Sequence, residues 1–255
     1  MLRQASTIAY YTLLEAMRNR LMWLLGLVLL VGVGFSGFLG GLAITESSDI
    51  QVAILAAFLR LTAVFLLVTF VVTSMIREIN DKGLDLVLAL QIPRAGYILG
   101  KMAGYAALAT VPAVVSGLVA VYFTTPVQAV YWTVSLLAEL WIVAAFSLLC
   151  VLTFSQVMTS LSAAMGFYLL ARSMTSLQLI GTAPYTGQTE SQKVINFVID
   201  TLTLLLPRLD GFTRTEWLTY HTGTLLVLGM LLMQAAVYVA FLTSAAVFDL
   251  YRKNL

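Results

Sequence analysis

Residues 77–101, REINDKGLDLVLALQIPRAGYILGK, form the one charged insert between the long apolar runs of this chain. Wound as a helix, the insert places its charged side chains at i, i+3, i+4 and i+7, on one face. These residues are Glu78, Asp81, Lys82 and Asp85. Pro93 has no backbone donor and disfavours helical geometry in the residue before it, so the helix should stop near Gln91. The pattern therefore predicts a helix lying along a membrane surface.

The composition on either side of this insert is that of a membrane protein. Hydrophobic residues make up 60% of the 255 residues and charged residues only 10%, whereas about 25% of a soluble domain is charged. The mean hydropathy is +0.95. A net charge of +2 gives no indication of nucleic-acid binding. We therefore predict an all-α polytopic membrane protein.

Six apolar runs are long enough to cross a bilayer, which takes about 20 residues. The predicted spans of this single transmembrane domain, residues 1–255, are 21–44, 52–76, 102–123, 132–154, 161–180 and 224–248. The first run is too long for the apolar part of a secretory signal, so we expect it to stay as a membrane helix. Short extracytoplasmic helices are expected between spans five and six, where the apolar stretch 194–206 is too short to cross.

The segment before the first span, residues 8–20, has an amphipathic pattern. Its apolar residues recur at helical spacing on one side. They are Tyr10, Leu13, Leu14, Met17 and Leu21. We therefore predict an N-terminal interfacial helix before the first span.

The distribution of basic residues predicts the orientation. In a six-span arrangement most of them fall on one side: Arg3, Arg18, Arg20, Arg77, Lys82, Arg94, Lys101, Arg252 and Lys253. The other side has only Lys193, Arg208 and Arg214. By the positive-inside rule, both termini and the 77–101 insert are cytoplasmic, and the chain is a multi-pass protein of the inner (cytoplasmic) membrane. Trp132, Trp217 and other aromatic residues near span ends are expected to be interfacial anchors.

Three ionisable residues lie inside predicted spans, all in the outer half of the bilayer: Arg60, Glu139 and Arg172. A charge at that depth costs about 1–3 kcal/mol unless it is paired or hydrated. One hypothesis is that Glu139 pairs with Arg60 or Arg172 beside a translocation route, which makes these three residues candidates for the substrate pathway. The alternative is a structural ion pair, or snorkelling, without substrate contact.

The sequence predicts no cofactor bound by this chain. The nearest approach to a phosphate-binding loop, Gly96–Lys101 followed by Met102, is one residue short and lacks the hydroxyl that would reach magnesium. Cys150 is the only cysteine and His221 the only histidine, so we expect no disulfide and no metal site. Met230 and Met233 would suit Cu(I), but methionine also fills gaps between apolar helices.

Several features of the insert together resemble the signature of permease subunits of type-2 ATP-binding-cassette exporters. They are the Arg77-Glu78 pair after a span, Gly83-Leu84, a leucine-rich turn, Pro93-Arg94, Tyr97 and Gly100-Lys101. The number and spacing of the predicted spans are also similar along nearly the whole chain.

In that family this segment is the coupling helix, which sits in a cleft of a separate ATPase subunit. The resemblance implies ATPase-coupling roles for Arg77, Glu78, Asp81, Lys82, Gly83, Asp85, Pro93, Arg94, Gly100 and Lys101. It also implies two copies of the permease, as a homodimer or with a related permease, in contact with membrane lipids. Two ATPase subunits would bind ATP and Mg, so this chain is not itself an enzyme.

The expected function is export of a lipid, an amphipathic compound or another small substrate. A permease that serves maturation of periplasmic metalloenzymes is an alternative. A non-transporting scaffold that relays ATPase motion to an extracytoplasmic partner is another, although the 181–223 segment is short for that role. A membrane enzyme would need a cluster of His, Asp or Glu, and only the 77–101 insert offers acidic residues close together.

Overall fold

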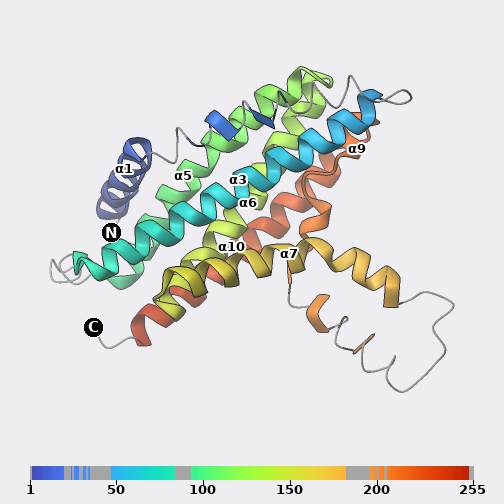
Figure 1. The fold of residues 1–255 in the computed structure, drawn as a ribbon. Helices are drawn as coiled ribbons and strands as arrows, with labels where there is room; N and C mark the ends of the chain where they lie inside the picture. The colour runs from blue at the N-terminus through green and yellow to red at the C-terminus, as the bar shows by residue number, and fades with distance from the viewer. Residues whose placement is uncertain are drawn as a thin grey trace.

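The computed structural model describes residues 2–19, 47–83, 93–181 and 206–252, and short helical pieces at 24, 26–28, 31–32, 34, 196–197, 199 and 201–203. Its helices are α1 (Leu2–Arg18), α3 (Ser47–Asn80), α5 (Arg94–Val121), α6 (Pro126–Phe154), α7 (Val157–Gly181), η1 (Leu209–Gly211), α9 (Glu216–Thr219) and α10 (Leu225–Arg252) (Figure 1). No strand occurs in these residues. The all-α class is therefore confirmed for this part of the chain.

Four of the described helices are long and apolar enough to cross a membrane. They comprise residues 49–80, 94–121, 126–154 and 225–252. Helix α7 has 25 residues but is more polar and is not one of the four. Most of the predicted span 21–44 lies outside the described residues, so the six-span count stays a prediction.

The membrane helices are longer than the predicted spans. Helix α3 begins at Ser47 and not near residue 52, and α5 begins at Arg94 and not at residue 102. Helix α6 begins at Pro126, where a proline is tolerated because its missing N–H would have no partner in the first turn. Hydropathy marks only the part of a helix that suits hydrocarbon, whereas backbone hydrogen bonds continue through the polar residues beyond it.

The long helices α3, α5, α6 and α10 run alongside one another, and both chain termini lie at the same end of the bundle (Figure 1). Helix α6 lies in the centre, in contact with α3, α5, α7 and α10. Helix α10 lies at the outside of the bundle and exposes Met233, Val237, Phe241 and Phe248. Side chains of this size exposed along a whole helix face mark a surface that contacts the membrane or another protein.

Helix α1 packs along α5, and its role as an interfacial helix stays a prediction. The large residues Tyr10 and Met17 are 62% and 61% exposed, whereas Thr12 and Ala16 are buried. A Cβ on Gly104 would lie 2.7 Å from the Cβ of Thr12. The small-residue side of α1 therefore meets a glycine of α5, because only small side chains allow two helices to approach so closely.

The predicted helix starting at Glu78 is wrong in its first turn. Arg77 and Glu78 belong to α3, which ends at Asn80. Asp81 and Lys82 form a turn in which Lys82 has a left-handed φ of 56°. Glu78 and Lys82 therefore do not share a helical face. Asp85 and the rest of the predicted helix to Gln91 lie outside the described residues.

The segment before α10 enters the bundle. It contains η1 and α9, and Leu209, Phe212 and Trp217 within it are buried. Trp132 of α6 is also fully buried. These two tryptophans therefore pack inside the protein, and the prediction that they anchor the chain at the membrane interface is wrong.

Candidate functional site

The three ionisable residues predicted inside the spans meet around one threonine. Arg172 of α7 lies 3.5 Å from Glu139 of α6, measured from Nη1 to Oε1. The Thr213 hydroxyl donates to Glu139 Oε2 at 2.7 Å. Arg60 of α3 donates from Nη1 to the Thr213 carbonyl at 3.2 Å. We call Arg60, Glu139, Arg172 and Thr213 the outer cluster.

The outer cluster satisfies the backbone of a buried turn. Arg172 Nη1 also donates to the carbonyls of Leu209 and Phe212, at 2.6 and 2.9 Å. The Thr213 N–H donates to Ser135 Oγ at 3.0 Å. Thr213 is fully buried and has a left-handed φ of 46°. Unpaired backbone groups are costly away from water, so these contacts allow residues 209–213 to lie inside the bundle.

The charge of the outer cluster is unbalanced, because two guanidinium groups face one carboxylate. Glu139 is completely buried, and the side chain of Arg172 is 21% exposed. The predicted pairing of Glu139 with an arginine is present, and the partner is Arg172. The contacts support a structural role for the pair, and substrate contact remains a hypothesis.

A second group of charged residues lies toward the other end of α3. Lys101 of α5 forms an ion pair with Glu78 of α3. Both carboxylate oxygens of Glu15, on α1, accept from the Ser74 hydroxyl at 3.0 Å. We call Glu15, Ser74, Glu78 and Lys101 the inner cluster.

The inner cluster is largely enclosed. Lys101 is only 5% exposed. A cavity of about 300 Å³ between α1, α3 and α5 is lined by Glu15, Glu78 and Lys101, among others. Because Lys101 belongs to α5 and its partner Glu78 to α3, this ion pair holds the two helices together.

Some of the predicted ATPase-coupling residues are exposed, and the others lie at contacts between helices. Arg77, Asp81 and Lys82 are exposed. Arg94 instead donates from Nη1 to the Leu250 carbonyl at 2.9 Å, at the end of α10. Its guanidinium also lies 5.8 Å from the centroid of the Tyr251 ring.

Gly100, like Arg94, lies at a contact between helices, because a Cβ there would come within 2.9 Å of Ile8 on α1. Pro93 is the N-cap residue of α5, and Gly83 is half-buried. Arg94, Gly100 and Lys101 therefore hold helices together, whereas the exposed residues cluster next to the end of α3.

Residues that sequence reasoning missed are the hydroxyl partners of the charges. Thr213 and Ser135 complete the outer cluster, and Glu15 and Ser74 belong to the inner one. Serine and threonine are common in membrane helices, and no spacing in the sequence connects position 135 with position 213. The acidic Glu15 in the N-terminal helix was the only sequence feature that could have indicated the inner cluster.

The described residues hold no group of three His, Cys, Asp or Glu side chains that could bind a metal ion. Cys150 is buried, and the exposed His221 lies 3.1 Å from the Thr124 hydroxyl. Residues 96–101, the nearest match to a phosphate-binding loop, lie within α5. Their N–H groups are therefore mostly used by the helix, which leaves no cradle for a phosphate. Comparison of the sequence with models of known protein families and with curated proteins finds no match.

Proposed function

We propose that this chain is the permease subunit of a type-2 ATP-binding-cassette exporter, with its ATPase on a separate polypeptide. The observation that carries the proposal is that one continuous helix, α3, contributes to both charged clusters. It carries Arg60 of the outer cluster and Glu78 of the inner one. The 18 residues from Arg60 to Glu78 correspond to about 27 Å along the helix axis. A displacement of one end of α3 therefore reaches the other.

The ATPase would dock on the exposed charges that follow α3. Asp81 and Lys82 form a turn beside the inner cluster and carry opposite charges. Charges of this kind orient a partner and set the register of docking. The Glu78–Lys101 pair joins α3 to α5, and Arg94 joins α5 to α10. A push at this surface would therefore act on three membrane helices together.

The response would be at the buried turn of residues 209–213. Arg60 donates to the Thr213 carbonyl, so movement of α3 would change how this turn is held against α6 and α7. Rigid-body displacement of packed helices is a common way of switching between two arrangements. In this proposal the turn opens and closes the outer side of the translocation route, and Arg60, Glu139 and Arg172 are its positioning residues.

The scaffold alternative is less well supported by the described outer residues. Leu209, Phe212 and Trp217 are buried in the bundle and do not present a surface for an outside partner. A permease for metalloenzyme maturation would use the same coupling and differ only in cargo. The proposed cargo class stays a lipid, an amphipathic compound or another small substrate, carried by two copies of the permease working with two ATPase subunits.

Cysteine cross-linking tests the proposed docking surface. The buried native thiol is first removed by Cys150→Ala, and Asp81→Cys is introduced in that background. The chain is co-expressed with a Walker-motif ATPase from the same genome that purifies with it, and the complex is treated with a bifunctional maleimide. We expect a permease–ATPase cross-link whose yield changes when ATP and vanadate are added.

The matched control is Glu216→Cys, an exposed acidic residue near the outer cluster, which should give no such cross-link. If Asp81→Cys fails to cross-link, or if both variants cross-link equally, the docking surface is wrongly assigned. Absence of any ATPase that purifies with the chain would overturn the exporter proposal itself.

A further inference from the structure

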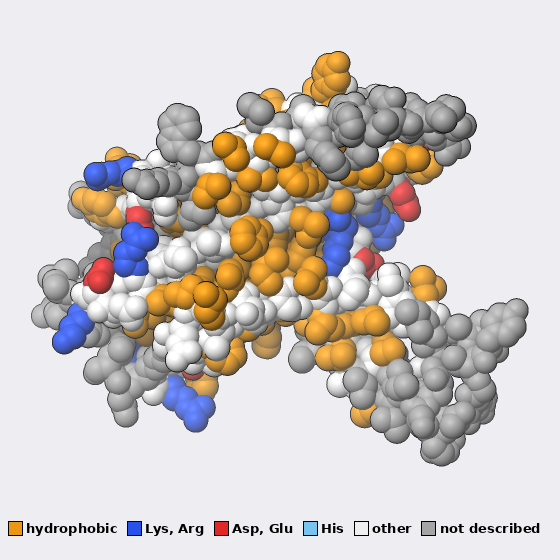
Figure 2. Space-filling view, in the orientation of Figure 1, with side chains coloured by type: hydrophobic (Ala, Val, Ile, Leu, Met, Phe, Trp, Pro, Cys, Tyr) orange, Lys and Arg blue, Asp and Glu red, His pale blue; other side chains and the backbone are white. Residues whose placement is uncertain are grey.

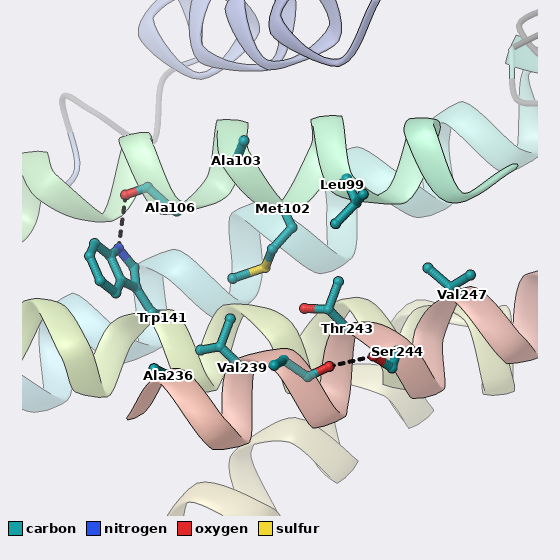
Figure 3. Close-up of a pocket in the computed structure, with 11 residues that line it drawn as sticks. Leu99, Met102, Ala103, Ala106, Trp141, Ala236, Val239, Thr243, Ser244 and Val247 are labelled. Atoms are coloured by element: carbon teal, nitrogen blue, oxygen red, sulfur yellow. Dashed lines mark hydrogen bonds between the residues drawn. The ribbon is translucent and has the colours of Figure 1, made fainter. Parts of the chain in front are cut away.

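A groove of about 680 Å³ runs between α5, α6 and α10, away from both charged clusters (Figure 3). Leu99 of α5 and Val247 of α10 lie at one end of it, and Trp141 of α6 and Ala236 of α10 lie at the other (Figure 3). The volume is within the roughly 300–1,000 Å³ range of sites that bind small molecules.

Small side chains leave the groove open along the surface of the bundle. Ala236, Ala240 and Ser244 stand one turn apart on α10, and Ala103 lies on α5; all four are exposed. Larger apolar side chains of α10, such as Met233 and Phe241, are also exposed next to the groove. The opening is therefore continuous with the exposed apolar surface of α10.

The polar groups of the groove are satisfied, with one exception. The Ser244 hydroxyl donates to the Ala240 carbonyl at 2.7 Å, and the Trp141 indole N–H donates to the Ala106 carbonyl at 3.2 Å. Thr243 is only 6% exposed, and its buried hydroxyl has no hydrogen-bond partner among the described residues. This hydroxyl is therefore able to donate to an acceptor on a molecule that lies in the groove.

The length of the groove matches one leaflet of a bilayer. From Ala236 to Val247 the helix rises about 16 Å, which is close to half of the roughly 30 Å hydrocarbon layer. Ala236 lies near the middle of α10, and Val247 lies near its end. The groove therefore runs from one surface of the membrane toward its midplane, as an acyl chain does.

Two arginines lie near the surface end of the groove, together with the carboxylate of Asp249, which accepts from the Thr153 hydroxyl at 3.1 Å. The Arg94 guanidinium contacts the Leu250 carbonyl, three residues beyond Val247. Arg252, in the same last turn of α10, is exposed. An arginine guanidinium suits a phosphate group because its planar donors match the phosphate oxygens.

From these features we propose that the groove holds one acyl chain of a phospholipid from the leaflet at the α10 C-terminus. Its phosphate lies beside Arg94 and Arg252, and the Thr243 hydroxyl donates to an ester carbonyl. The lipid is a resident component of the fold. The assignment goes beyond the proposed export function and holds whether or not an ATPase docks at Asp81.

Trp141 makes the groove testable by fluorescence, because bromine atoms on a lipid chain quench a tryptophan that they contact. The full chain is placed in vesicles of phosphatidylglycerol brominated either near the methyl end or near the headgroup. Since Trp141 lies at the deep end, we expect bromines near the methyl end to quench at least about twofold more. Subtracting the signal of Trp141→Phe assigns this quenching to Trp141.

Filling the groove separates a resident chain from lipid that merely surrounds the protein. Ala240→Phe should reduce the deep quenching by at least about half. Ala107→Phe, at an exposed position of α5 outside the groove, should not. Equal quenching in these two variants would mean surrounding lipid only and would overturn the proposal. Protection of Trp141 from every brominated lipid would also overturn it, because a second copy or another protein would then occupy the groove.

The headgroup contacts are tested by native mass spectrometry of the solubilised full chain. We expect one retained phosphatidylglycerol, and at least about threefold less retention in Arg252→Gln and in Thr243→Val. Arg214→Gln, an exposed arginine elsewhere in the chain, should retain the lipid as the native chain does. Unchanged retention in both test variants would refute the assigned phosphate and ester contacts.

Discussion

Glu139 has no solvent exposure, and its two oxygens are divided between Arg172 and Thr213. The backbone carbonyl of Thr213 accepts a hydrogen bond from Arg60. The Glu139–Arg172 pair is therefore stabilised by hydrogen bonds as well as by opposite charge, which burial of an ion requires. The free-energy cost of placing these charges in an apolar bundle is offset by their hydrogen bonds to the turn of residues 209–213.

Replacing Glu139 with glutamine should loosen this turn. The change keeps the shape but removes the carboxylate that Arg172 and Thr213 contact, and we expect a loss of about 1.5–3 kcal/mol, as for hydrogen bonds to charged groups. Thermal unfolding in detergent should show a lower Tm. Glu216→Gln makes the same chemical change at an exposed position and should leave Tm nearly unchanged. Equal behaviour of the two variants would rule out the structural role of Glu139.

The Glu78–Lys101 pair is suited to a double-mutant cycle. Lys101→Met alone leaves a largely buried carboxylate unpaired, and we expect it to cost about 3–5 kcal/mol. The double variant Glu78→Gln, Lys101→Met removes both charges and should recover part of that loss, because the apolar side chain then has no unpaired neighbour. Denaturant unfolding of the four proteins measures the coupling. Strictly additive effects would show that the pair does not brace α3 against α5.

At the level of elements, close contact between α1 and α5 depends on glycine. A Cβ at position 104 would meet Thr12 Cβ at 2.7 Å and the Ala9 carbonyl at 3.1 Å, and both atoms are on a packed helix that cannot easily move. This contact also positions Glu15 beside Ser74. Helix α1 is therefore part of the inner cluster as well as a candidate membrane-surface helix.

We expect Gly104→Ala to separate α1 from α5 locally. Amide hydrogen exchange of residues 5–18 should become at least about tenfold faster, because their packing would be lost. Gly229→Ala is the control: its Cβ would meet no atom within 4 Å, and alanine has the higher helix propensity. Unchanged exchange of α1 in Gly104→Ala would contradict the contact.

On the scale of the whole molecule, the charges mark the two ends of the bundle. Arg18, Arg77, Lys82, Arg94 and Arg252 belong to the end where α1 and α3 finish, α5 begins and α10 terminates. Figure 2 shows most of the Lys and Arg side chains of that face at one end of the molecule, with apolar side chains over much of the surface between the ends. Which of these ends faces the cytoplasm stays a prediction.

Cysteine labelling in intact cells tests that orientation. In the Cys150→Ala background, Lys82→Cys should be protected from a membrane-impermeant maleimide until the membrane is opened. Glu216→Cys, close to the outer cluster, should react without opening. Both residues are exposed in the fold, so the difference reports the side of the membrane. Reaction of both variants from the same side would refute the topology.

The sequence alone predicted helices, membrane residence and the need of Glu139 for a basic partner. Hydropathy and the cost of a buried charge are properties of single residues and short stretches, so they can be read without knowing the fold. It also placed the charged residues Asp81 and Lys82 just beyond the end of a span, but in a helix and not in the turn that the structure has there. Span ends were misplaced by several residues, because polar residues continue a helix beyond the apolar part.

Only the tertiary structure decided which residues meet. Glu139 and Thr213 are 74 positions apart, and their hydrogen bond depends on a turn that enters the bundle between α3, α6 and α7. The inward orientation of Lys101, the side of α1 that packs on Gly104 and the groove beside Trp141 are likewise set by neighbouring helices. Contacts between distant segments depend on how whole helix surfaces fit, and that information is not contained in the pattern of any one helix.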